Sequence, residues 1–473
     1  MIYVIWGTGS FASKHCQAVF AEYDIDFFCD NDEKKWGEQF FGKRIEPGNK
    51  LFEYSPDAVT VIILSDLYYR EISVQLSEMG ISNIGFLKDE RFVFLPFYDE
   101  ECFIKGENYI HYPYCKANKH TIKKVLFVAW GLNYKRPHSY AAALKHHGIL
   151  SYYAYENKEF GNFTQELANH MFEETIQIRD VLSFYNHVKE SDYDLVHVMM
   201  PAYALFLKST GKTVIMELID YYSLMEISNP LTNRRSIAIE NAALSLADGV
   251  VFLNEPIRRF VTNKNKMPEK RALTFPFYIS SDYIPICRKD GYECEETHCV
   301  FVGQLGLNLD HRDYTNLFCK FEQARVHIHI YAYGPPETLS YYETLAKDSG
   351  FIHFNMEVSY GELLTELTRF DIGIATYCFT PGDDLFLRTS FSGKVFDYLM
   401  AGLPVAVCDT EILSEFVDKL SCGKVVDFNG DLKKQLEDIK NIRIDKDFCI
   451  SNGLIMEKNI GRLIDFYSEV VIC

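Results

Sequence analysis

Short apolar strands alternate with amphipathic helical stretches in three successive series along this chain, and this alternation constrains the fold more than any other feature. The first series contains "IYVIWG" and "AVTVIILS", the second "KKVLFVAWG" and "KTVIMELID", and the third "HCVFVGQLG" and "LPVAVCD". Strands rich in Val, Ile and Phe that alternate with helices predict parallel sheets with right-handed crossover connections. Because a single hydrophobic core stops growing beyond about 250 residues, the 473-residue length predicts several such domains.

Two irregular segments separate the three series and set the expected domain limits. The segment 101–122 is polar and aromatic without a period, and "PICRKDGYECEET" at 285–297 is charged and irregular. We therefore predict an α/β fold with three tandem Rossmann-like units, followed by a helix in "GLIMEKNIGRLIDFYSEVV". The expected parts are an N-terminal domain at 1–100, a linker at 101–122, a second domain at 123–284, a third domain at 297–449 and a C-terminal helical segment at 450–473.

The composition is that of an ordinary globular protein, with 48% hydrophobic and 24% charged residues. No apolar run reaches the ~18 residues of a transmembrane helix, and the first residues lack the basic stretch of a signal peptide. Thirteen cysteines without a C-x-x-C pair are typical of a reducing compartment, so we expect a cytoplasmic protein. The formal charge of −18 argues against nucleic acid as a general partner.

Two local clusters of ligand-binding residue types stand out from this background. Cys294, His298 and Cys299 lie close in sequence but lack a second ligand pair, so we expect no metal site there. The segment 255–271 is either the solvated end of a helix or a patch for an anionic acceptor or for the inner membrane surface. Against two Glu residues it carries six cations, namely Arg258, Arg259, Lys264, Lys266, Lys270 and Arg271.

The first strand runs directly into a glycine turn, "VIWGTGSFASKH", in which Gly7, Gly9 and Ala12 form a G-x-G-x-x-A pattern ahead of a helix. The first glycine permits a tight turn, and the second lets a phosphate approach backbone N–H groups. Asp30 ends the next strand, 21 residues after Gly9, where a ribose-binding carboxylate is expected. This pattern fits a nucleotide site, an NAD site or a purely architectural turn.

The segment that follows, "FFCDNDEKKWGEQFFGKRI", resembles the N-terminal domain of bacterial hexapeptide-repeat acyltransferases that modify nucleotide-linked amino sugars. The resemblance covers only the first domain, and the repeat domain of that family has no counterpart here. It implies that this domain contacts a nucleotide sugar. An NAD-dependent dehydrogenase would instead need a catalytic Tyr and Lys. Tyr185 and Lys189 have the Y-x-x-x-K spacing, but they fall in the second series.

The third series carries "SFSGKVFDYLMAGLPVAV", in which a glycine precedes a helix and a buried strand. The pattern puts Lys394 and Asp397 on one face of a helix that begins near Gly393. Backbone N–H groups at the helix N-terminus and the Lys394 ammonium favour a phosphate. Asp397 is an acceptor suited to a pair of ribose hydroxyls. The alternative is a surface ion pair worth only about 0.3–0.5 kcal/mol.

The stretch "KVFDYLMAGLPV" resembles the C-terminal motif K-[LV]-[FY]-[ED]-Y-[LM]-x-[AS]-G-x-P-V of glycogen-synthase-like GT-B glycosyltransferases. Upstream, "VIMELIDYYS", "IENAALSLADGVVFLN", "HCVFVGQLG" and "IHIYAYGPPE" resemble further segments of that family, so the resemblance spans residues 123–470. It implies tandem Rossmann-like domains (GT-B) preceded by the additional N-terminal Rossmann-like domain, and a C-terminal helix that crosses back to the second domain. It also implies a UDP- or GDP-linked sugar as substrate, no required cofactor and no metal.

The carboxylates of the third domain depart from the family pattern. Asp397 stands where the family usually has Glu, one methylene longer. Thr389 occupies the position of the earlier Glu in the family's E-x7-E motif. Asp383 and Asp384 in "TPGDDLF" are the candidates to supply the contact with the donor sugar instead.

The cations of the third domain depart as well. Gln304 stands where the family often brings an Arg to the diphosphate, and Arg312 and Arg388 are the candidates to replace it. The resemblance implies a donor site formed by Gly303, Gln304, Asp383, Arg388, Ser392, Gly393, Lys394 and Asp397.

The second domain is expected to supply the acceptor side. "AWGLNYKRPHS" gives a turn at Gly131 followed by Lys135, Arg136 and His138, in position to touch the donor phosphate or the acceptor. His138 is either an active-site histidine or a loop histidine. Glu217 and Asp220 end a strand that faces the predicted cleft, and Asp220 is either the base or the N-cap of the next helix.

These patterns favour a metal-independent glycosyltransferase that moves a sugar from a nucleotide sugar to a cell-surface glycan, a lipid-linked acceptor or a protein. Fixed N–H groups and cations can stabilise a leaving diphosphate without a divalent ion. Two alternatives remain open: an NAD-dependent nucleotide-sugar oxidoreductase or epimerase, and a non-catalytic nucleotide-sugar-binding protein.

Overall fold

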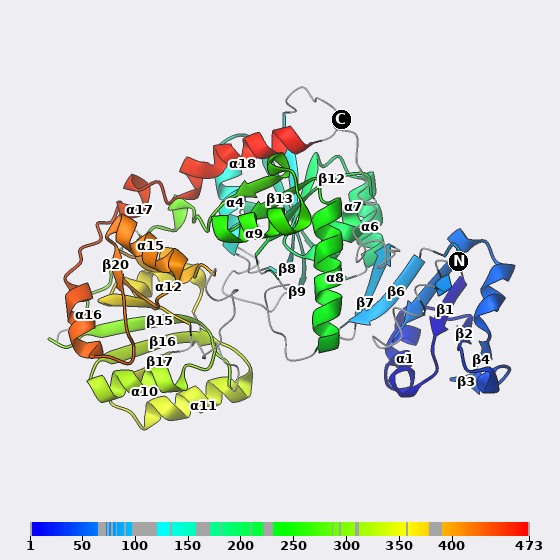
Figure 1. The fold of residues 1–473 in the computed structure, drawn as a ribbon, viewed down its shortest axis with the longest axis horizontal. Helices are drawn as coiled ribbons and strands as arrows, with labels where there is room; N and C mark the ends of the chain where they lie inside the picture. The colour runs from blue at the N-terminus through cyan, green and yellow to red at the C-terminus, as the bar shows by residue number, and fades with distance from the viewer. Residues whose placement is uncertain are drawn as a thin grey trace.

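The protein folds into three sheets with their helices, which lie in a row in Figure 1. The computed structural model describes residues 2–64, 72, 75–76, 79–81, 83–88, 91–96, 121–132, 135–157, 171–179, 181–208, 210–219, 221, 230–285, 287–292, 295–307, 312–355, 358–377 and 390–471. Two of the sheets are parallel and Rossmann-like, and an N-terminal domain with a mixed sheet precedes them. The predicted α/β fold class is therefore confirmed.

The N-terminal domain is a seven-stranded sheet in the order β3-β4-β2-β1-β5-β6-β7. Its inner strands are parallel, but antiparallel hairpins, β3–β4 and β6–β7, close both edges, where the alternation predicted parallel pairing only. Helix α1 packs on one face of the sheet. The elements are β1 (Ile2–Trp6), α1 (Ser10–Glu22), β2 (Phe27–Cys29), η1 (Glu33–Lys35), β3 (Gln39–Phe40), β4 (Lys43–Glu46), η2 (Gly48–Glu53), η3 (Pro56–Ala58), β5 (Val59–Ile63), β6 (Asn83–Lys88) and β7 (Arg91–Pro96).

The middle domain is a fully parallel seven-stranded sheet in the order β10-β9-β8-β11-β12-β13-β14. Helices α6 to α9 cover one face, and α4 with the C-terminal helix α18 cover the other. Strand β7 of the N-terminal domain lies against α6 and α7 (Figure 1). The elements are β8 (Lys124–Gly131), α4 (Lys135–Lys145), β9 (Leu150–Asn157), β10 (Glu174–Gln177), α6 (Val181–Glu190), β11 (Leu195–Val198), α7 (Pro201–Lys208), β12 (Thr213–Leu218), α8 (Pro230–Leu246), β13 (Gly249–Phe252), α9 (Glu255–Asn265), η5 (Glu269–Arg271) and β14 (Ala272–Thr274).

The C-terminal domain is a parallel six-stranded sheet in the order β17-β16-β15-β18-β19-β20. Helices α12, α14 and α15 cover one face, and α10, α11 and α16 the other. The elements are η6 (Ser281–Tyr283), β15 (His298–Gln304), α10 (Thr315–Ala324), β16 (His327–Tyr333), α11 (Pro336–Lys347), β17 (Ile352–Asn355), α12 (Tyr360–Leu367), β18 (Ile372–Ala375), α14 (Lys394–Met400), β19 (Val405–Val407), α15 (Glu411–Leu420), β20 (Gly423–Val425), α16 (Leu432–Lys440), α17 (Phe448–Ser451) and α18 (Met456–Val470).

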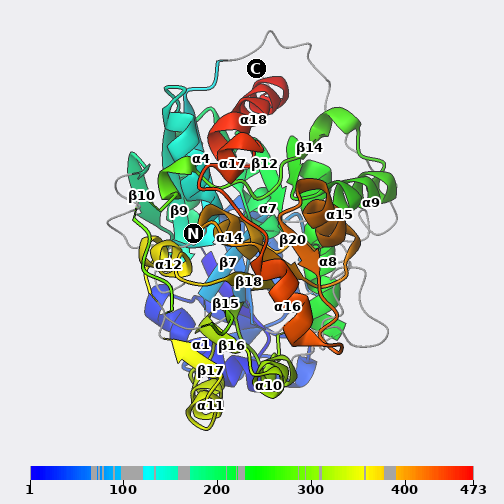
Figure 2. The same cartoon turned by 90° about the vertical axis from the view of Figure 1, so that its left-hand side faces the viewer.

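The chain passes twice between the middle and C-terminal domains, and the two passages are tied together. The Met456 N–H donates to the Ile279 carbonyl at 3.0 Å, and the Ser281 N–H donates to the Glu457 carboxylate at 3.0 Å. Helix α18, red in Figures 1 and 2, then runs across the middle domain, where Phe466 and Tyr467 join the core. Among the described residues, no helix combines the length and apolarity needed to cross a bilayer.

Candidate functional site

Helix α14 is fixed against the sheet by one tyrosine. The Tyr398 hydroxyl accepts from the Val302 N–H at 2.9 Å and donates to the Ile374 carbonyl at 3.1 Å, so it joins the helix to β15 and β18. Gly373 of β18 leaves room for the Tyr398 ring, because a Cβ there would lie 2.1 Å from it. This close approach sets where the side chains of α14 lie.

The packing of α14 brings Lys394 to the carboxyl end of β15. The ammonium Nζ lies 4.0 Å from the centre of the Phe301 ring, and a Cβ added to Gly303 would lie 3.1 Å from Nζ. Gly303 has a φ of +153°, which a residue with a side chain rarely adopts. The structure therefore brings Lys394 and Gly303, two of the predicted donor-site residues, close together. Gln304 follows Gly303 as the last residue of β15.

The other predicted donor residues are placed as follows. Ser392 is buried, and its carbonyl accepts from the Val395 N–H at 3.1 Å, while Gly393 caps α14. The Arg312 carbonyl accepts from the Gly306 N–H at 3.0 Å within the loop after β15. The remaining candidates lie outside the described residues, namely Asp383, Asp384 and Arg388 of this domain and Asp220 of the middle domain, and so does Thr389, which stands in place of the family's Glu.

Asp397 makes a polar contact between the middle and C-terminal domains. The Lys135 ammonium at the start of α4 pairs with Oδ2, and the Tyr360 hydroxyl donates to Oδ1 at 2.6 Å. The Asp397 side chain is 1% exposed, whereas Lys135 is 38% exposed and lies 4.4 Å over the Tyr360 ring. Burial, and then the Asp397 charge, raise the pKa of Tyr360 well above its usual value, so its hydroxyl stays a neutral donor.

Arg136 does not lie where the sequence predicted. It is buried, pairs with Glu217, and donates to the Phe275 carbonyl at 2.5 Å and the Pro276 carbonyl at 2.6 Å. Glu217 is equally buried and lies 3.2 Å from His197 Nε2. Although burial opposes ionisation, Arg136 and His197 hold the pKa of Glu217 below its usual value. Arg136 and Glu217 are thus paired with each other inside the middle domain, and these contacts do not favour the predicted ligand contact of Arg136 or the predicted cleft position of Glu217.

His138 is also buried rather than exposed to a ligand. Its Nε2 lies 2.8 Å from the Leu132 carbonyl, and the rings of Tyr153 and Phe172 pack on it edge to face. Burial lowers the pKa of His138 to about 4. His138 therefore belongs to helix α4 and not to a loop, and its burial does not favour the active-site interpretation. The alanines one turn later in "PHSYAAALK" were the signal that this face of α4 is core. The preceding turn at Gly131 is held by the Tyr153 hydroxyl, which donates to its carbonyl at 2.5 Å.

The N-terminal glycine turn is closed by its own acidic residue. Gly7 has a φ of +104°, and its N–H donates to the Cys29 carbonyl at 2.7 Å, while Gly9 caps α1. The Asp30 carboxylate accepts from the Thr8 N–H at 2.9 Å and pairs with Lys35 at 3.0 Å. Although burial opposes it, hydrogen bonds from the Thr8 hydroxyl, the Asp32 N–H and the Lys35 ammonium lower the pKa of Asp30. The Asp30 carboxylate is therefore engaged within the glycine turn and the segment that follows it.

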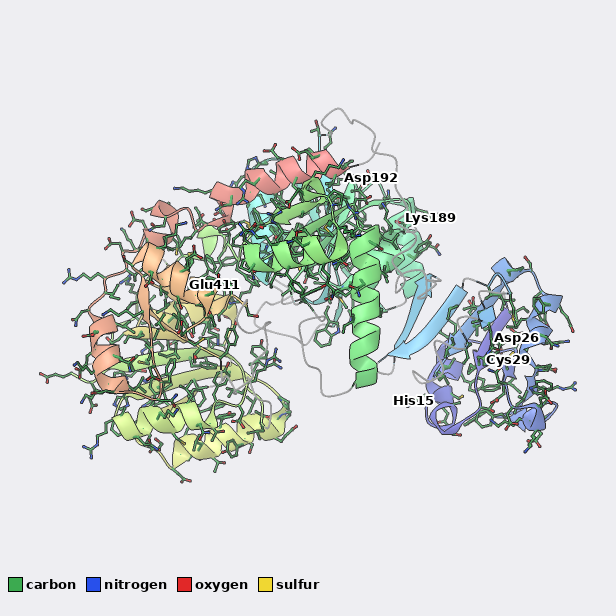
Figure 3. The ribbon with its side chains drawn as sticks, viewed as in Figure 1. His15, Asp26, Cys29, Lys189, Asp192 and Glu411 are labelled. Carbon is green, nitrogen blue, oxygen red and sulfur yellow. The ribbon has the colours of Figure 1, made fainter. Side chains whose placement is uncertain are left out.

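Two further predicted features are explained by contacts within the chain. Lys189 lies exposed on the middle domain, whereas Cys29, next to the glycine turn, lies on the N-terminal domain (Figure 3). The Y-x-x-x-K pair therefore belongs to a different domain from the predicted NAD turn. In the basic segment 255–271, Arg258 pairs with Glu255 and Glu269, Arg259 with Glu255, and Lys264 contacts Tyr221, while Arg271 donates to the carbonyls at the end of α8. These contacts favour an ordinary helix end over a membrane patch.

The structure also shows a row of histidines that the sequence analysis did not assign. His298 of β15 lies 2.9 Å from His329 of β16, and His327 of β16 lies 2.8 Å from His353 of β17, all as nitrogen–nitrogen distances. Within the described part of the chain, which excludes Cys294, no group of three or more His, Cys, Asp or Glu side chains is arranged to hold a metal ion.

Comparisons with known proteins agree with this architecture. Residues 2–84 match the family model described as C2185-like, N-terminal. Most of the remaining chain is similar to a glycosyltransferase from Rickettsia africae ESF-5, at 12% identity, with 74% of this chain and 99% of that chain covered and a TM-score of 0.51. A search of the curated proteins gave no significant match.

Two further solved structures are similar at lower scores. One is AviGT4, a glycosyltransferase involved in avilamycin A biosynthesis, at 13% identity and a TM-score of 0.48, with 74% and 98% of the two chains covered. The other is a UDP-N-acetylglucosamine 2-epimerase-like protein from Listeria monocytogenes, at 11% identity and a TM-score of 0.49, with 73% and 95% covered. At these identities the likeness to the Rickettsia enzyme shows the fold alone. The chain thus has a GT-B glycosyltransferase-like fold over about three-quarters of its length, preceded by a C2185-like N-terminal domain.

Proposed function

We propose that the protein is a cytoplasmic, metal-independent glycosyltransferase that uses a UDP- or GDP-linked sugar. The observation that carries the proposal is the Lys394 ammonium beside Gly303, at the carboxyl end of β15. Ligands of open parallel sheets bind outside the carboxyl ends of the strands. A glycine without a side chain and a cation next to it together suit the close approach of a diphosphate.

The proposed chemistry follows from charge. Displacement of a nucleoside diphosphate from the sugar carbon develops negative charge on the leaving group, which Lys394 would stabilise. Gln304, Ser392 and Gly393 would line the same site with polar and backbone groups. We propose Asp220 as the group that orients or deprotonates the acceptor hydroxyl, and Asp383 and Arg388 as further donor contacts. The acceptor would be a glycan, a lipid-linked sugar or a protein.

Release of nucleoside diphosphate from a panel of nucleotide sugars tests this proposal. We expect one UDP- or GDP-sugar to be hydrolysed slowly without acceptor, and faster with cell-surface glycan or lipid-linked acceptors. An absorbance change that requires NAD would instead support the oxidoreductase alternative. Nucleotide binding without turnover under any acceptor would support a binding protein. For the N-terminal domain we propose an accessory role, because Asp30 is engaged within its own turn.

A further inference from the structure

The aromatic ring of Phe301 lies directly under the Lys394 ammonium. Phe301 belongs to β15, two residues before Gly303, and its side chain is fully buried. The Lys394 Nζ lies 4.0 Å from the centre of this ring and 5.9 Å from the centre of the Tyr314 ring. An ammonium within about 6 Å of a ring centre is attracted by the negative face of the ring. Because Phe301 is the nearer of the two rings, it supplies the larger part of this attraction.

The Phe301 ring is itself held in one position by its neighbours. Its centroid lies 4.5 Å from that of Tyr314, and the Phe318 ring packs on it edge to face at 5.5 Å. Tyr314 is fixed in turn, because its N–H donates to the Tyr342 hydroxyl at 2.9 Å and its hydroxyl donates to the Thr376 carbonyl at 3.3 Å. Phe301 therefore presents a rigid face to the lysine.

Gly303 leaves the space through which the lysine reaches this face. A Cβ at Gly303 would lie 3.1 Å from the Lys394 Nζ, 3.6 Å from its Cε and 3.7 Å from Cζ of Phe301. A side chain at position 303 would thus compete with Lys394 for the place over the ring. Two residues of one strand, an aromatic ring and a glycine, together define where the ammonium lies.

We propose that Phe301 is a positioning residue, whose ring holds the Lys394 ammonium at the carboxyl end of β15 before a nucleotide arrives. This inference rests on the proposed function, because it concerns the cation of the same donor site. An ammonium has three N–H donors, so Lys394 can keep the ring on one side and donate to a phosphate on another. Without the ring, binding would have to order the lysine, and ordering one long side chain lowers affinity by about two- to tenfold.

Stepwise fluorination of the ring tests this role. Fluorine at the ring edge withdraws electron density from the face with little change in volume, so it weakens a cation–π contact in steps. The experiment replaces Phe301 in the full chain with phenylalanine that carries one, two or three ring fluorines, and titrates each protein with UDP and GDP by calorimetry. For the nucleotide that binds more tightly, we expect the affinity to fall at each step, to about fivefold below wild type with three fluorines. Equal affinity across the series would overturn the inference.

The same series in place of Phe318 is the matched control. Phe318 is fully buried in the same core and packs against Phe301, so fluorine there tests the effect on packing. We expect the nucleotide affinity of this series to stay within about twofold of wild type. A graded loss of the same size at both positions would show a general packing effect and would contradict the role of Phe301.

A double-mutant cycle shows whether Phe301 acts through Lys394. Phe301→Leu keeps an apolar side chain and removes the ring, and we expect it to weaken nucleotide binding by about two- to tenfold. In the Lys394→Ala background the same change should cause no further loss. Losses that add in the double variant would contradict the inference. Failure of both nucleotides to bind the wild-type protein would contradict the proposed function as well, whereas binding that does not depend on the ring contradicts this inference alone.

Discussion

The Tyr467 hydroxyl lies 2.5 Å from Nδ1 of His197, and this contact joins the C-terminal helix to the middle sheet. His197 is in turn 3.2 Å from Glu217, which pairs with Arg136. The same arginine holds the carbonyls of Phe275 and the next residue, where the chain leaves for the C-terminal domain. One buried polar network therefore supports both passages between the domains.

Glu217→Gln should destabilise the protein strongly. The change leaves the Arg136 charge buried without its counter-charge, and breaking such a pair costs about 3–5 kcal/mol. Chemical denaturation measures the free energy of unfolding. The control is Asp192→Asn, because Asp192 is 78% exposed and its pairing with Lys124 should contribute little to the free energy of unfolding. Equal, small losses in the two variants would show that the network does not hold the middle domain together.

Gly373→Ala should disturb α14 through the Tyr398 ring. A methyl group at this position would lie 2.1 Å from the Tyr398 ring. The ring cannot move away freely, because its hydroxyl accepts one hydrogen bond from β15 and donates another to β18. Overpacking of this kind costs about 1–3 kcal/mol, and we expect nucleotide binding to weaken with it because α14 carries Lys394. Gly350→Ala is the matched control, since nothing lies within 4 Å of a Cβ there. If both variants melt alike, α14 is not positioned as described.

The row of histidines predicts loss of stability in mild acid. Burial, and then the neighbouring His327, lower the pKa of His298 to about 4, and burial, and then His353, lower the pKa of His329 to about 2. Because the pKa of an unfolded histidine is near 6.5, the unfolded chain binds more protons than the folded one below that pH. The free energy of unfolding should therefore fall as the pH drops from about 6.5 towards 4.

The surroundings of the row show which groups contribute to this behaviour. Tyr292 stacks on His298 at 3.9 Å between centroids, and Glu296 lies 2.9 Å from His327. Asp371 raises the pKa of His298, whereas the cations Arg369 and Lys440 lower the pKa values in the row. His329→Gln should flatten the dependence of the melting temperature on pH between 7 and 5, and His147→Gln, on an exposed turn, should not. Parallel pH profiles for wild type and His329→Gln would contradict this account.

Transfer activity should survive chelation by EDTA. In the proposed mechanism Lys394 and fixed backbone N–H groups stabilise the negative charge that develops on the leaving diphosphate, so no divalent ion is needed. The measurement is the initial rate of nucleoside diphosphate release before and after EDTA treatment. A complete loss of rate that Mg²⁺ restores would show that the leaving group depends on a metal.

The sequence predicted those features that depend on local pattern. The alternation of strands and helices indicated the parallel sheets, and the family resemblance grouped Lys394 and Gly303 in one predicted donor site. What it could not supply were partners distant in the chain. Lys135 contacts Asp397 across 262 positions and Arg136 contacts Glu217 across 81, and no local pattern in the sequence indicates either pairing. The antiparallel hairpin of β6 and β7 was missed because an edge strand carries the same apolar pattern as an inner one.

The most direct test of the donor site is the affinity of Lys394→Ala for the nucleotide sugar that the panel identifies. We expect a loss of about 2 kcal/mol or more, the size of a charge-assisted phosphate contact, while the protein keeps its melting temperature. Lys347→Ala, which removes a lysine that is 69% exposed and pairs with Glu343, should bind like the wild type. Unchanged affinity and turnover in a folded Lys394→Ala protein would contradict the donor site, and with it the proposed function.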